Sequence, residues 1–543
     1  MRAADARAAR LARLAAEDWD ILVIGGGISG AGVLREAARR SWKAALVEQR
    51  DFAWGTSSRS SKLVHGGLRY LKEGQLRTTL HSVRERQRLL AEAPELIERQ
   101  SFLFADRRGR KPGRWLFQLG LAIYDRMAGE RSHAYHDAAA TLRLAPGLST
   151  ADLRGSMVYR DAKTDDARLV WRVLMEAEAD GGLALNYVAA RAPVLVDGRV
   201  AGLEVQDAET GIRYDLRARA VVNATGVWAD KLRGAVGGRP MLRPLRGSHL
   251  VLPAWRLPVA QAISLMHPHD GRPVFFYPWE GATLVGTTDL DHRDGLEREA
   301  AITPAEVAYL LAAVNDQFPG LAIGPADVAA SYAGVRPVLD DGTANPSAAG
   351  RDHVVLDERG LISVTGGKLT TFRLMAEDAL ALAAGRIGKP FARDAGPVFR
   401  PAAALDARLP AALRHRLAAR YGAAAATVLA EAAPAECEQL PGSDGYWLEL
   451  RRAARAEAVV HLDDLLLRRS RIGILLPEGG RALLPRVRAL CQPVLGWDDA
   501  HWDAEEARYL ALIANHYSLP PLEAIPDWQG YLGGEGGAPV STT

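Results

Sequence analysis

The chain has 543 residues, of which 48% are hydrophobic and 24% are charged, a balance that excludes a disordered or fibrous protein. Its 68 basic and 65 acidic side chains leave a formal charge of +3, which gives no overall field to attract nucleic acid. The two cysteines, Cys437 and Cys491, lack the spacing of a zinc site or disulfide framework, and no apolar run reaches the ~20 residues that span a bilayer. We therefore expect a cytoplasmic chain without a metal site, with roughly two to four domains at about 100–200 residues each.

The first elements form a βαβ unit. The apolar run Trp19–Ile24 closes on Gly25-Gly-Gly27, which predicts a buried parallel strand that ends in a tight turn. Residues 28–40 have helical spacing, and Ala44–Val47 is a second buried strand. Residues 1–18 precede this unit as an Ala/Arg-rich extension without the apolar core and cleavage site of a signal peptide.

Later segments extend this sheet and add two further parts. The apolar runs at 218–222 and 361–364 also end near glycine, as expected of more strands of one parallel sheet. Residues 191–216 and 247–289 show short alternating strands, which predict antiparallel sheet. Residues 409 to about 517 are mostly helical and predict a separate C-terminal domain. The fold class is therefore α/β, with an antiparallel substrate domain and a helical C-terminal domain.

The glycine turn carries the first functional pattern. Gly25-x-Gly27-x-x-Gly30 is followed by Glu48 at the end of the second strand. The glycines let backbone N–H groups approach a pyrophosphate, and the acid can accept both hydroxyls of a ribose. Strand, helix, strand and acid follow in order, so the pattern predicts a dinucleotide site rather than a glycine turn selected only for packing. The acid argues against NADP and leaves both NAD and FAD open.

The segment after the acid distinguishes these two cofactors. Gly55-Thr-Ser-Ser58 and Ser60-Ser-Lys-Leu-Val-His65-Gly-Gly-Leu-Arg69-Tyr70 are dense in small hydroxyls and glycines. An NAD domain would have an ordinary crossover helix here. A chain that folds back along a long, extended cofactor needs such small donors, so the segment favours FAD.

These motifs, together with others further along, resemble the FAD-dependent glycerol-3-phosphate dehydrogenases. The motifs that carry the resemblance are Thr56-Ser-Ser58, Ser60-Ser-Lys-Leu-Val-His-Gly-Gly-Leu-Arg-Tyr-Leu71, Asp165-Asp-Ala-Arg-Leu-Val170, Asn223-Ala-Thr-Gly-Val-Trp228, Gly247-Ser-His249, Pro278-Trp279, Gly286-Thr-Thr-Asp289, Gly334-Val-Arg-Pro337, Gly366-Gly-Lys-Leu-Thr-Thr-Phe-Arg373 and Asp463-Asp-Leu-Leu-Leu-Arg-Arg469. They cover nearly the whole chain, whereas the amine and amino-acid oxidases resemble it much less beyond the first glycine motif.

The resemblance implies a Rossmann-like FAD-binding fold of the amino-acid-oxidase type. It implies an oxidoreductase domain at 19–395 and a C-terminal helical domain at 396–529, and the Gly/Ser/Thr-rich composition of residues 530–543 predicts a disordered tail. Within the first domain, the FAD-binding parts are 19–100, 150–240 and 350–395, and the substrate or cap parts are 101–149 and 241–349. The implied FAD-binding residues are Gly25, Gly27, Gly30, Glu48, Thr56, Ser57, Ser61, Ala224, Gly226, Gly367, Lys368, Leu369 and Thr370.

The implied reaction is oxidation of sn-glycerol 3-phosphate to dihydroxyacetone phosphate, with the C2 hydride passing to N5 of FAD. Candidates for phosphate binding are Arg69, Arg336 and Arg351, whose forks match phosphate oxygens, together with Tyr70 and Lys368. His65 and His249 are candidate bases, and Arg336 is an alternative group that polarises the C2 oxygen. Lys368 is also expected beside the flavin, where a cation stabilises the reduced form.

The route by which electrons leave has two alternatives. Residues 115–124 are an apolar decapeptide flanked by Lys111, Arg114 and Arg126, which suits a monotopic anchor reaching a membrane quinone, although a core helix of the cap explains it equally well. The family's oxidases, which use O₂, carry an insertion that this chain lacks. A quinone-linked enzyme, peripheral on the cytoplasmic face of the inner membrane, is therefore favoured over an oxidase or an enzyme for another 2-hydroxy acid.

Three further expectations concern the basic surface runs, the oligomeric state and alternative classes of function. The basic runs at 451–455 and 468–471 are interpreted as solvated helix faces, with contact to an anionic lipid surface as the alternative. The C-terminal helices offer a surface for a homodimer. A flavin-binding scaffold or a nucleic-acid-modifying flavoprotein is the alternative from another class, and the lack of a clustered basic patch argues against the latter.

Overall fold

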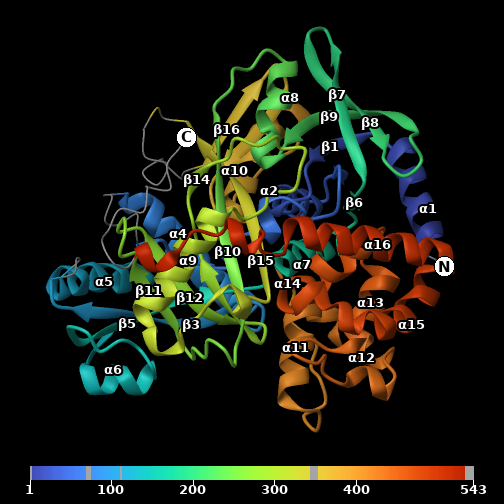
Figure 1. Ribbon diagram of the computed structural model, residues 1–543. Coiled ribbons are helices and arrows are strands. Elements are labelled where there is room, and N and C mark those ends of the chain that lie inside the picture. Colours follow the sequence, from blue (N-terminus) through green and yellow to red (C-terminus); the bar gives the residue numbers. More distant parts are fainter. Residues whose placement is uncertain are drawn as a thin grey trace.

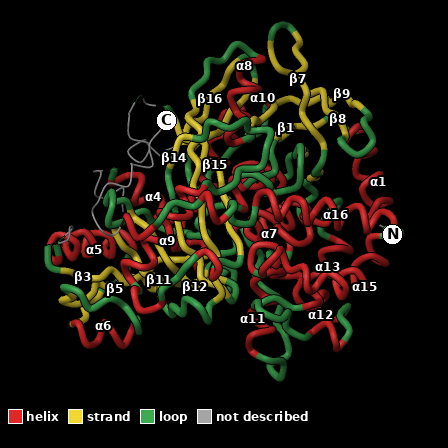
Figure 2. The backbone as a smooth tube through the Cα atoms, viewed as in Figure 1, coloured by secondary structure: helices red, strands yellow, loops and turns green. Residues whose placement is uncertain are grey.

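Two large sheets and a group of helices make up the molecule in a computed structural model, which describes residues 3–68, 75–109, 113–340, 342, 353–394 and 396–531 (Figure 1). Figure 2 shows the strands gathered into these two sheets, with the C-terminal helices covering one side. In the described part of the chain, no helix has both the length and the apolarity needed to cross a bilayer.

The first sheet confirms the predicted parallel arrangement. β1 (Trp19–Ile24) pairs in parallel with β2 (Ala44–Val47) and with β9 (Arg213–Asn223), and β9 pairs in parallel with β17 (Leu361–Gly366). The strand order along its path is β16-β17-β9-β1-β2-β6. The other strands are β6 (Leu183–Leu185), β7 (Val188–Val196), β8 (Arg199–Asp207) and β16 (His353–Glu358).

Helices cover one face of the first sheet and bury apolar side chains against it. α2 (Ile28–Ala38) packs against α7 (Asp166–Ala179) and α10 (Phe372–Ile387). Their buried side chains form one cluster with the inward residues of β1 and β2. This packing fixes the carboxyl ends of the parallel strands, where ligands bind in open α/β sheets.

The second sheet is mostly antiparallel, as expected, with one parallel pair between β3 and β11. Its strands are β3 (Glu98–Arg107), β4 (Ala134–Asp137), β5 (Leu153–Lys163), β10 (Leu242–Pro253), β11 (Ala262–Met266), β12 (Pro273–Trp279), β13 (Ala282–Gly286), β14 (Leu290–Asp291) and β15 (Ala330–Leu339). Helix α9 (Pro304–Gln317) packs on this sheet. Helices α5 (Arg114–Ala128) and α6 (Ala138–Leu144) contact β5 of this sheet. Helix α8 (Ala229–Ala235) contacts β7 and β17 of the first sheet, and α4 (Leu76–Glu92) contacts α5 and adds Leu89 and Leu90 to the cluster of the first sheet.

The C-terminal helices gather on the side of the molecule opposite α5 and α6 (Figure 1). They are α11 (Ala411–Tyr421), α12 (Ala425–Ala430), α13 (Trp447–Ala456), α14 (Ile472–Leu475), α15 (Leu484–Leu495) and α16 (Asp499–His516). Trp447 and Leu465 of this part share one buried cluster with Trp279 and Tyr332 of the second sheet. Much of the helical part therefore shares its core with the sheet, whereas α11 and α12 form a smaller buried cluster within the helical part itself.

The prediction that residues 468–471 form a solvated face is wrong. Arg468, Arg469 and Arg471 are buried, and Arg469 donates to both oxygens of Asp51 in the first sheet's connection (2.8 and 2.7 Å). A buried guanidinium is stable only when its charge and donors are satisfied, and a carboxylate on another element does this here. In contrast, Arg455 of the other basic run is exposed.

The two ends of the described chain are both packed. The N-terminal extension forms α1 (Ala3–Ala16), which buries Leu11 and Leu14 and touches α13 and α15. The predicted tail from residue 530 overlaps a 3₁₀ turn at Trp528–Tyr531, whose Trp528 packs against α9. Residues 532–543 lie outside the described residues.

Candidate functional site

The glycine turn between β1 and α2 forms the floor of a first cleft. Gly25 has a φ of +106°, and a Cβ there would lie 2.6 Å from the carbonyl oxygen of Ala224. A Cβ on Gly30 would lie 1.9 Å from the carbonyl oxygen of Gly25. Gly25 is therefore needed for the turn, whereas Gly30 is needed so that α2 can approach the strand.

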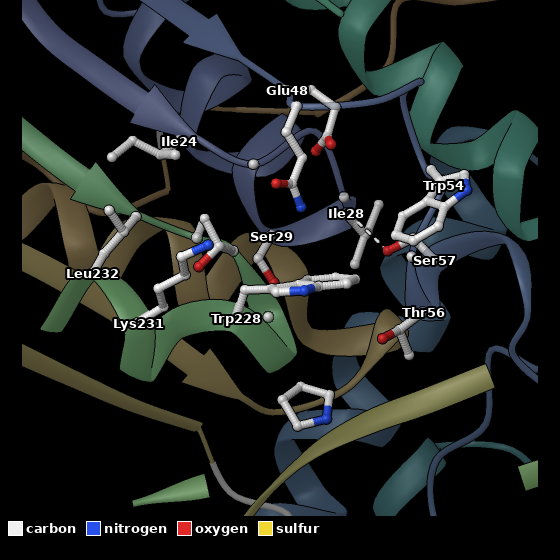
Figure 3. Close-up of a pocket in the computed structure, with 18 of the residues that line it drawn as sticks. Ile24, Ile28, Ser29, Glu48, Trp54, Thr56, Ser57, Trp228, Lys231 and Leu232 are labelled. Carbon is white, nitrogen blue, oxygen red and sulfur yellow. Dashed lines mark hydrogen bonds between the residues drawn. The ribbon is translucent and has the colours of Figure 1, made fainter. Parts of the chain in front are cut away.

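Glu48 lies at the end of β2, where the sequence pattern predicts it. Its carboxylate accepts hydrogen bonds from the N–H of Gly26 (2.6 Å) and of Arg50 (2.9 Å). Burial raises the pKa of Glu48. The Ser57 hydroxyl accepts from the N–H of Ile28 (3.0 Å) at the start of α2, so this part of the lining is also fixed (Figure 3).

The first cleft contains about 1290 Å³ of empty space. Of the predicted FAD-binding residues, those that line it are Gly25, Gly27, Glu48, Thr56, Ser57, Ala224, Gly226, Gly367, Lys368 and Leu369. Figure 3 shows Ser29, Glu48, Ser57 and Trp228 facing this space. Ser61 and Thr370 do not line it and lie instead in a second cleft.

The second cleft contains about 1640 Å³ of empty space and joins the first at Thr56, Pro337 and residues 367–369. It has a charged part and an apolar part. The charged part includes Arg272, Arg336, Lys368 and Asp289, and the apolar part consists of Leu63, Leu68, Phe102, Tyr159 and Phe275. A ligand in the first cleft and one in the second therefore meet beside Lys368.

Arg336 is the fixed cation of this second cleft. Its Nη1 donates to Asp289 Oδ1 (2.7 Å) and its Nη2 donates to Thr287 Oγ1 (2.9 Å). A Cβ at Gly247 would lie 2.1 Å from Arg336 Nη2, so the glycine of the Gly247-Ser-His motif leaves room for the guanidinium. Arg272, which the sequence did not single out, donates to the carbonyl oxygen of Asp289 (2.8 Å) and lines the same cleft.

Lys368 stands at the junction of the two clefts. It precedes the turn Leu369–Thr371 that leads into α10, and its Nζ donates to the hydroxyl of Ser82 (3.0 Å). The predicted strand-to-helix turn is thus confirmed. Its ammonium brings positive charge to the place where the clefts meet.

The two candidate histidines are placed differently. His65 lines the second cleft, and its backbone oxygen accepts from the Thr370 hydroxyl (3.2 Å). His249 is buried behind Ser61 and does not line the cleft: its Nε2 lies 2.9 Å from Ser61 Oγ, and its ring stacks on Tyr332 at 4.6 Å. Burial, with the nearby charges of Lys62 and Arg336, lowers the pKa of His249 well below its usual range.

Three predicted substrate residues, Arg69, Tyr70 and Arg351, lie outside the described residues. In contrast, the structure adds Asp289 and Arg272, which come from segments far from the first glycine motif in sequence. Asp289 closes the Gly286-Thr-Thr-Asp289 motif, so an acid inside a motif that carries the family resemblance was the available signal. Arg272 had none, because arginine is abundant throughout the chain.

Comparison with known proteins agrees with this geometry. Residues 20–380 match the family model described as FAD dependent oxidoreductase, and residues 387–502 match the C-terminal domain of alpha-glycerophosphate oxidase. The chain is 36% identical over 537 residues to glycerol-3-phosphate dehydrogenase 2 of Mycobacterium tuberculosis, which covers 93% of this chain and 90% of that protein. The chain belongs to the FAD-dependent glycerol-3-phosphate dehydrogenase family.

Other members of the family are similar over different lengths. The aerobic glycerol-3-phosphate dehydrogenase of Bacillus subtilis is 37% identical over 385 residues, or 70% of this chain and 69% of that one. The solved glycerol-3-phosphate dehydrogenase of Bacillus halodurans, complexed with FAD, matches with a TM-score of 0.73 and 27% identity over 97% of this chain and 99% of that chain. Glycine oxidase from Geobacillus kaustophilus, with a TM-score of 0.54 and 20% identity over 70% of this chain and 98% of that chain, shares the fold.

FAD is the cofactor of this family, and the first cleft fits it. The glycine turn has no space for side chains at Gly25 and Gly30, and it opens helix α2, whose N-terminal N–H groups suit a pyrophosphate. Glu48 supplies the acceptor expected for a ribose. The donor set and the cradle therefore both agree with an extended dinucleotide.

Proposed function

We propose that this protein oxidises sn-glycerol 3-phosphate to dihydroxyacetone phosphate with FAD. The observation that carries the proposal is the charged part of the second cleft, where Arg272, Arg336 and Lys368 stand beside His65 and next to the FAD cleft. Arg59 and Asp161 also line this cleft, but they are paired with Glu299 and Arg86. The other three cations, with the single carboxylate of Asp289, favour a small anionic substrate over an amino acid or an amine.

In this proposal the chain binds and orients the substrate and takes up one proton. The guanidinium of Arg336, held by Asp289 and Thr287, presents a fixed fork to the phosphate or to the C2 oxygen. Arg69, Tyr70 and Arg351 are proposed to join it on the phosphate. Bound FAD supplies the acceptor for the C2 hydride.

His65 is the proposed base, because it lines the cleft whereas His249 is screened by Ser61. A neutral imidazole accepts the hydroxyl proton as the hydride leaves, so the alcohol loses one proton and one hydride in total. His249, whose lowered pKa keeps it neutral, acts through the Ser61 hydroxyl rather than directly on the substrate.

The electrons are proposed to pass to a membrane quinone. One side of α5 exposes Trp115 (74%), Leu116 (70%) and Leu119 (59%), whereas Leu121 and Tyr124 are buried. The buried side agrees with a core helix of the cap, and we propose the exposed side as the membrane anchor. An apolar face bordered by Arg114 and Arg126 suits an anionic membrane surface.

An aromatic path leads from this helix to the cleft. The ring of Phe117 on α5 lies 6.2 Å from that of Tyr159, and Phe102 stacks on Tyr159 at 5.3 Å. Both Tyr159 and Phe102 line the apolar part of the second cleft. This arrangement favours entry of an apolar acceptor from the side of α5.

Two further expectations are kept as proposals: the protein attaches peripherally to the cytoplasmic face of the inner membrane, and it forms a homodimer through the C-terminal helices.

A coupled assay distinguishes the quinone proposal from its alternative. The purified enzyme is given sn-glycerol 3-phosphate in air, with and without a soluble quinone analogue, while dihydroxyacetone phosphate and hydrogen peroxide are both measured. We expect product to form rapidly only with the quinone. Peroxide in a one-to-one ratio to product, at the same rate without quinone, would identify an oxidase instead.

A further inference from the structure

Lys62 is a fully buried cation that the proposed reaction does not use. It lies in the segment that carries Ser61 and His65 of the second cleft, yet it does not line either cleft itself. Its φ of +54° places it in the left-handed region, which is uncommon for a residue other than glycine. Strained conformations of this kind persist where surrounding contacts determine them, and they cluster at functional sites.

The ammonium of Lys62 has a complete set of partners. Its Nζ donates to the carbonyl oxygen of Ser58 (3.0 Å) and to both oxygens of Asp166 (3.0 and 3.2 Å). The same Nζ lies 4.9 Å from the ring centre of Trp279 and 4.7 Å from that of Tyr332. A buried ion pair is often no more stabilising than a well-packed apolar residue, so its presence beside a cleft indicates a role other than stability.

The partners of Lys62 also hold its neighbours. Asp166, at the start of α7, accepts from the N–H (3.0 Å) and the hydroxyl (2.8 Å) of Ser60. From the C-terminal helices, Arg471 donates to Asp166 (3.1 Å) and to the carbonyl oxygen of Ser58 (2.8 Å). Tyr332 donates to the carbonyl oxygen of Ser60 (3.1 Å). The segment before Ser61 is thus fixed from both halves of the chain.

We propose that Lys62 is a positioning residue: through Asp166 and Ser58 it fixes the segment that presents Ser61 and His65 to the substrate, and it links Arg471 of the C-terminal helices to the second cleft. This inference rests on the proposed oxidation, because it assigns Lys62 to the same cleft. The charge of Lys62 is part of the role, since the carboxylate of Asp166 is oriented by it.

The protonation of Lys62 makes the proposal measurable. Burial, with the charge of Arg471, lowers the pKa of Lys62 to about 8, against the opposing effect of Asp165 and Asp166. The charged and titratable groups around it are Asp165 and Asp166 on α7, Arg471 in the C-terminal part, His249 on β10, Tyr277 on β12 and Tyr332 on β15. Above about pH 8 the ammonium becomes an amine with two N–H groups, so it can no longer serve all three acceptor oxygens of Ser58 and Asp166, and the ion pair with Asp166 is lost.

The test compares wild type, Lys62→Met and Lys62→Arg. The first-order rate of flavin bleaching by saturating sn-glycerol 3-phosphate is measured without oxygen between pH 6 and 10. We expect the wild-type rate to fall with an apparent pKa near 8. In Lys62→Arg the fall moves up by more than about one pH unit, because a guanidinium keeps its proton. Lys62→Met has no such fall, and at pH 7 its rate is lower than wild type by roughly 10–100-fold.

Lys163→Met is the matched control. Lys163 bridges to Leu63 from β5 and donates to the carbonyl oxygen of Pro278 (3.0 Å), but it lies outside the second cleft. It should keep the wild-type rate and pH profile. A fall at the same pH in Lys62→Arg as in wild type, or a Lys62→Met rate equal to that of Lys163→Met, would overturn the proposal. If Lys62→Met does not bind FAD, the shift in Lys62→Arg decides alone.

A second measurement does not depend on turnover. The unfolded chain keeps the lysine proton to about pH 10.4, whereas the folded chain releases it near pH 8, so the contribution of Lys62 to stability rises between these values. The Tm of wild type minus that of Lys62→Met should therefore increase from pH 8 to 10. A constant difference would contradict the assignment. If wild type is not bleached at all, the proposed oxidation fails, and this comparison still tests Lys62.

Discussion

Arg336 and Asp289 form an ion pair of 2.7 Å within the second cleft, next to the place where the FAD cleft opens into it. Asp289 holds the guanidinium in one orientation and neutralises part of its charge. The remaining attraction for an anion then comes from Arg272, Arg336 and Lys368 together. This balance suits a substrate that must be bound and also released.

Replacing Arg336 with Gln should reduce kcat/KM for sn-glycerol 3-phosphate by roughly 10²–10³-fold. The loss corresponds to about 3–4 kcal/mol, as expected for a charge-assisted fork that contacts the reacting substrate. Steady-state kinetics with a quinone analogue measures it, with FAD content determined for each variant. The control is Arg256→Gln, which removes a comparable pair with Asp327 outside both clefts and should leave kcat/KM within about 2-fold. Equal losses in both variants would contradict a substrate role for Arg336.

Gly30→Ala should abolish FAD binding. The added Cβ would lie 1.9 Å from the carbonyl oxygen of Gly25, so α2 must move away from the turn that holds the pyrophosphate. The flavin absorbance of the purified protein is the measurement. Gly385→Ala is the matched control, because Gly385 is also helical and its Cβ meets no neighbour within 4 Å. It should keep FAD and gain about 0.5–1 kcal/mol of stability; retention of FAD by Gly30→Ala would show that the turn is not the binding cradle.

The His461–Glu505 pair predicts a pH window for stability. Although burial opposes it, hydrogen bonding to Glu209 and Glu505 raises the pKa of His461 to about 10. The pKa of Glu505 is lowered to about 2, because hydrogen bonds to His461 and Arg508 outweigh burial. The histidine contribution is therefore complete below about pH 6.5 and is lost as pH rises toward 10, and the glutamate contribution is lost as pH falls from about 4.5 toward 2.

His461→Gln should accordingly cost about 1–2 kcal/mol at pH 6, after allowance for solvent screening of this partly exposed pair. The deficit should shrink progressively as pH rises from 7 to 10. Thermal unfolding of wild type and variant across this range measures it, with His415→Gln, a more exposed pair with Glu98, as the comparison. A deficit that does not change with pH would show that His461 is not charged in the folded protein.

Binding to a membrane surface should depend on the exposed face of α5. The double change Trp115→Ser and Leu119→Ser removes two large side chains from that face and should weaken sedimentation with vesicles of anionic phospholipid at least about 10-fold. Trp255→Ser removes an even more exposed Trp (80%) from the loop between β10 and β11 and is the control. If both proteins bind equally, or if binding is lost only with Trp255→Ser, α5 is not the docking face.

Much of the fold could be predicted because local patterns determine it. β1 and β2 have the predicted bounds, since a short apolar run before a glycine turn has few alternatives to a buried parallel strand. The position of Lys368 between strand and helix was predictable for the same reason. The glycine turn and the acid that ends β2 were also enough to locate the first cleft.

The features that the sequence did not predict depend on contacts between distant segments. Arg468, Arg469 and Arg471 have the composition of a surface, and their burial depends in part on the carboxylates of Asp51 and Asp166, which come from distant segments. His249 was predicted beside the substrate, but the hydroxyl of Ser61, nearly 190 residues away, comes between it and the cleft. A sequence pattern gives residue types and spacing, whereas the side chain that reaches the cleft first is decided by packing.

The most direct test of the proposed oxidation is anaerobic bleaching of the bound flavin. The holoenzyme is mixed without oxygen with sn-glycerol 3-phosphate, and in parallel with its mirror-image isomer and with glycerol. We predict prompt loss of the oxidised flavin absorbance with sn-glycerol 3-phosphate only, and its return on addition of a quinone analogue. A flavin that remains oxidised with sn-glycerol 3-phosphate, or that bleaches equally with glycerol, would contradict the assignment of the charged cleft to a phosphorylated substrate.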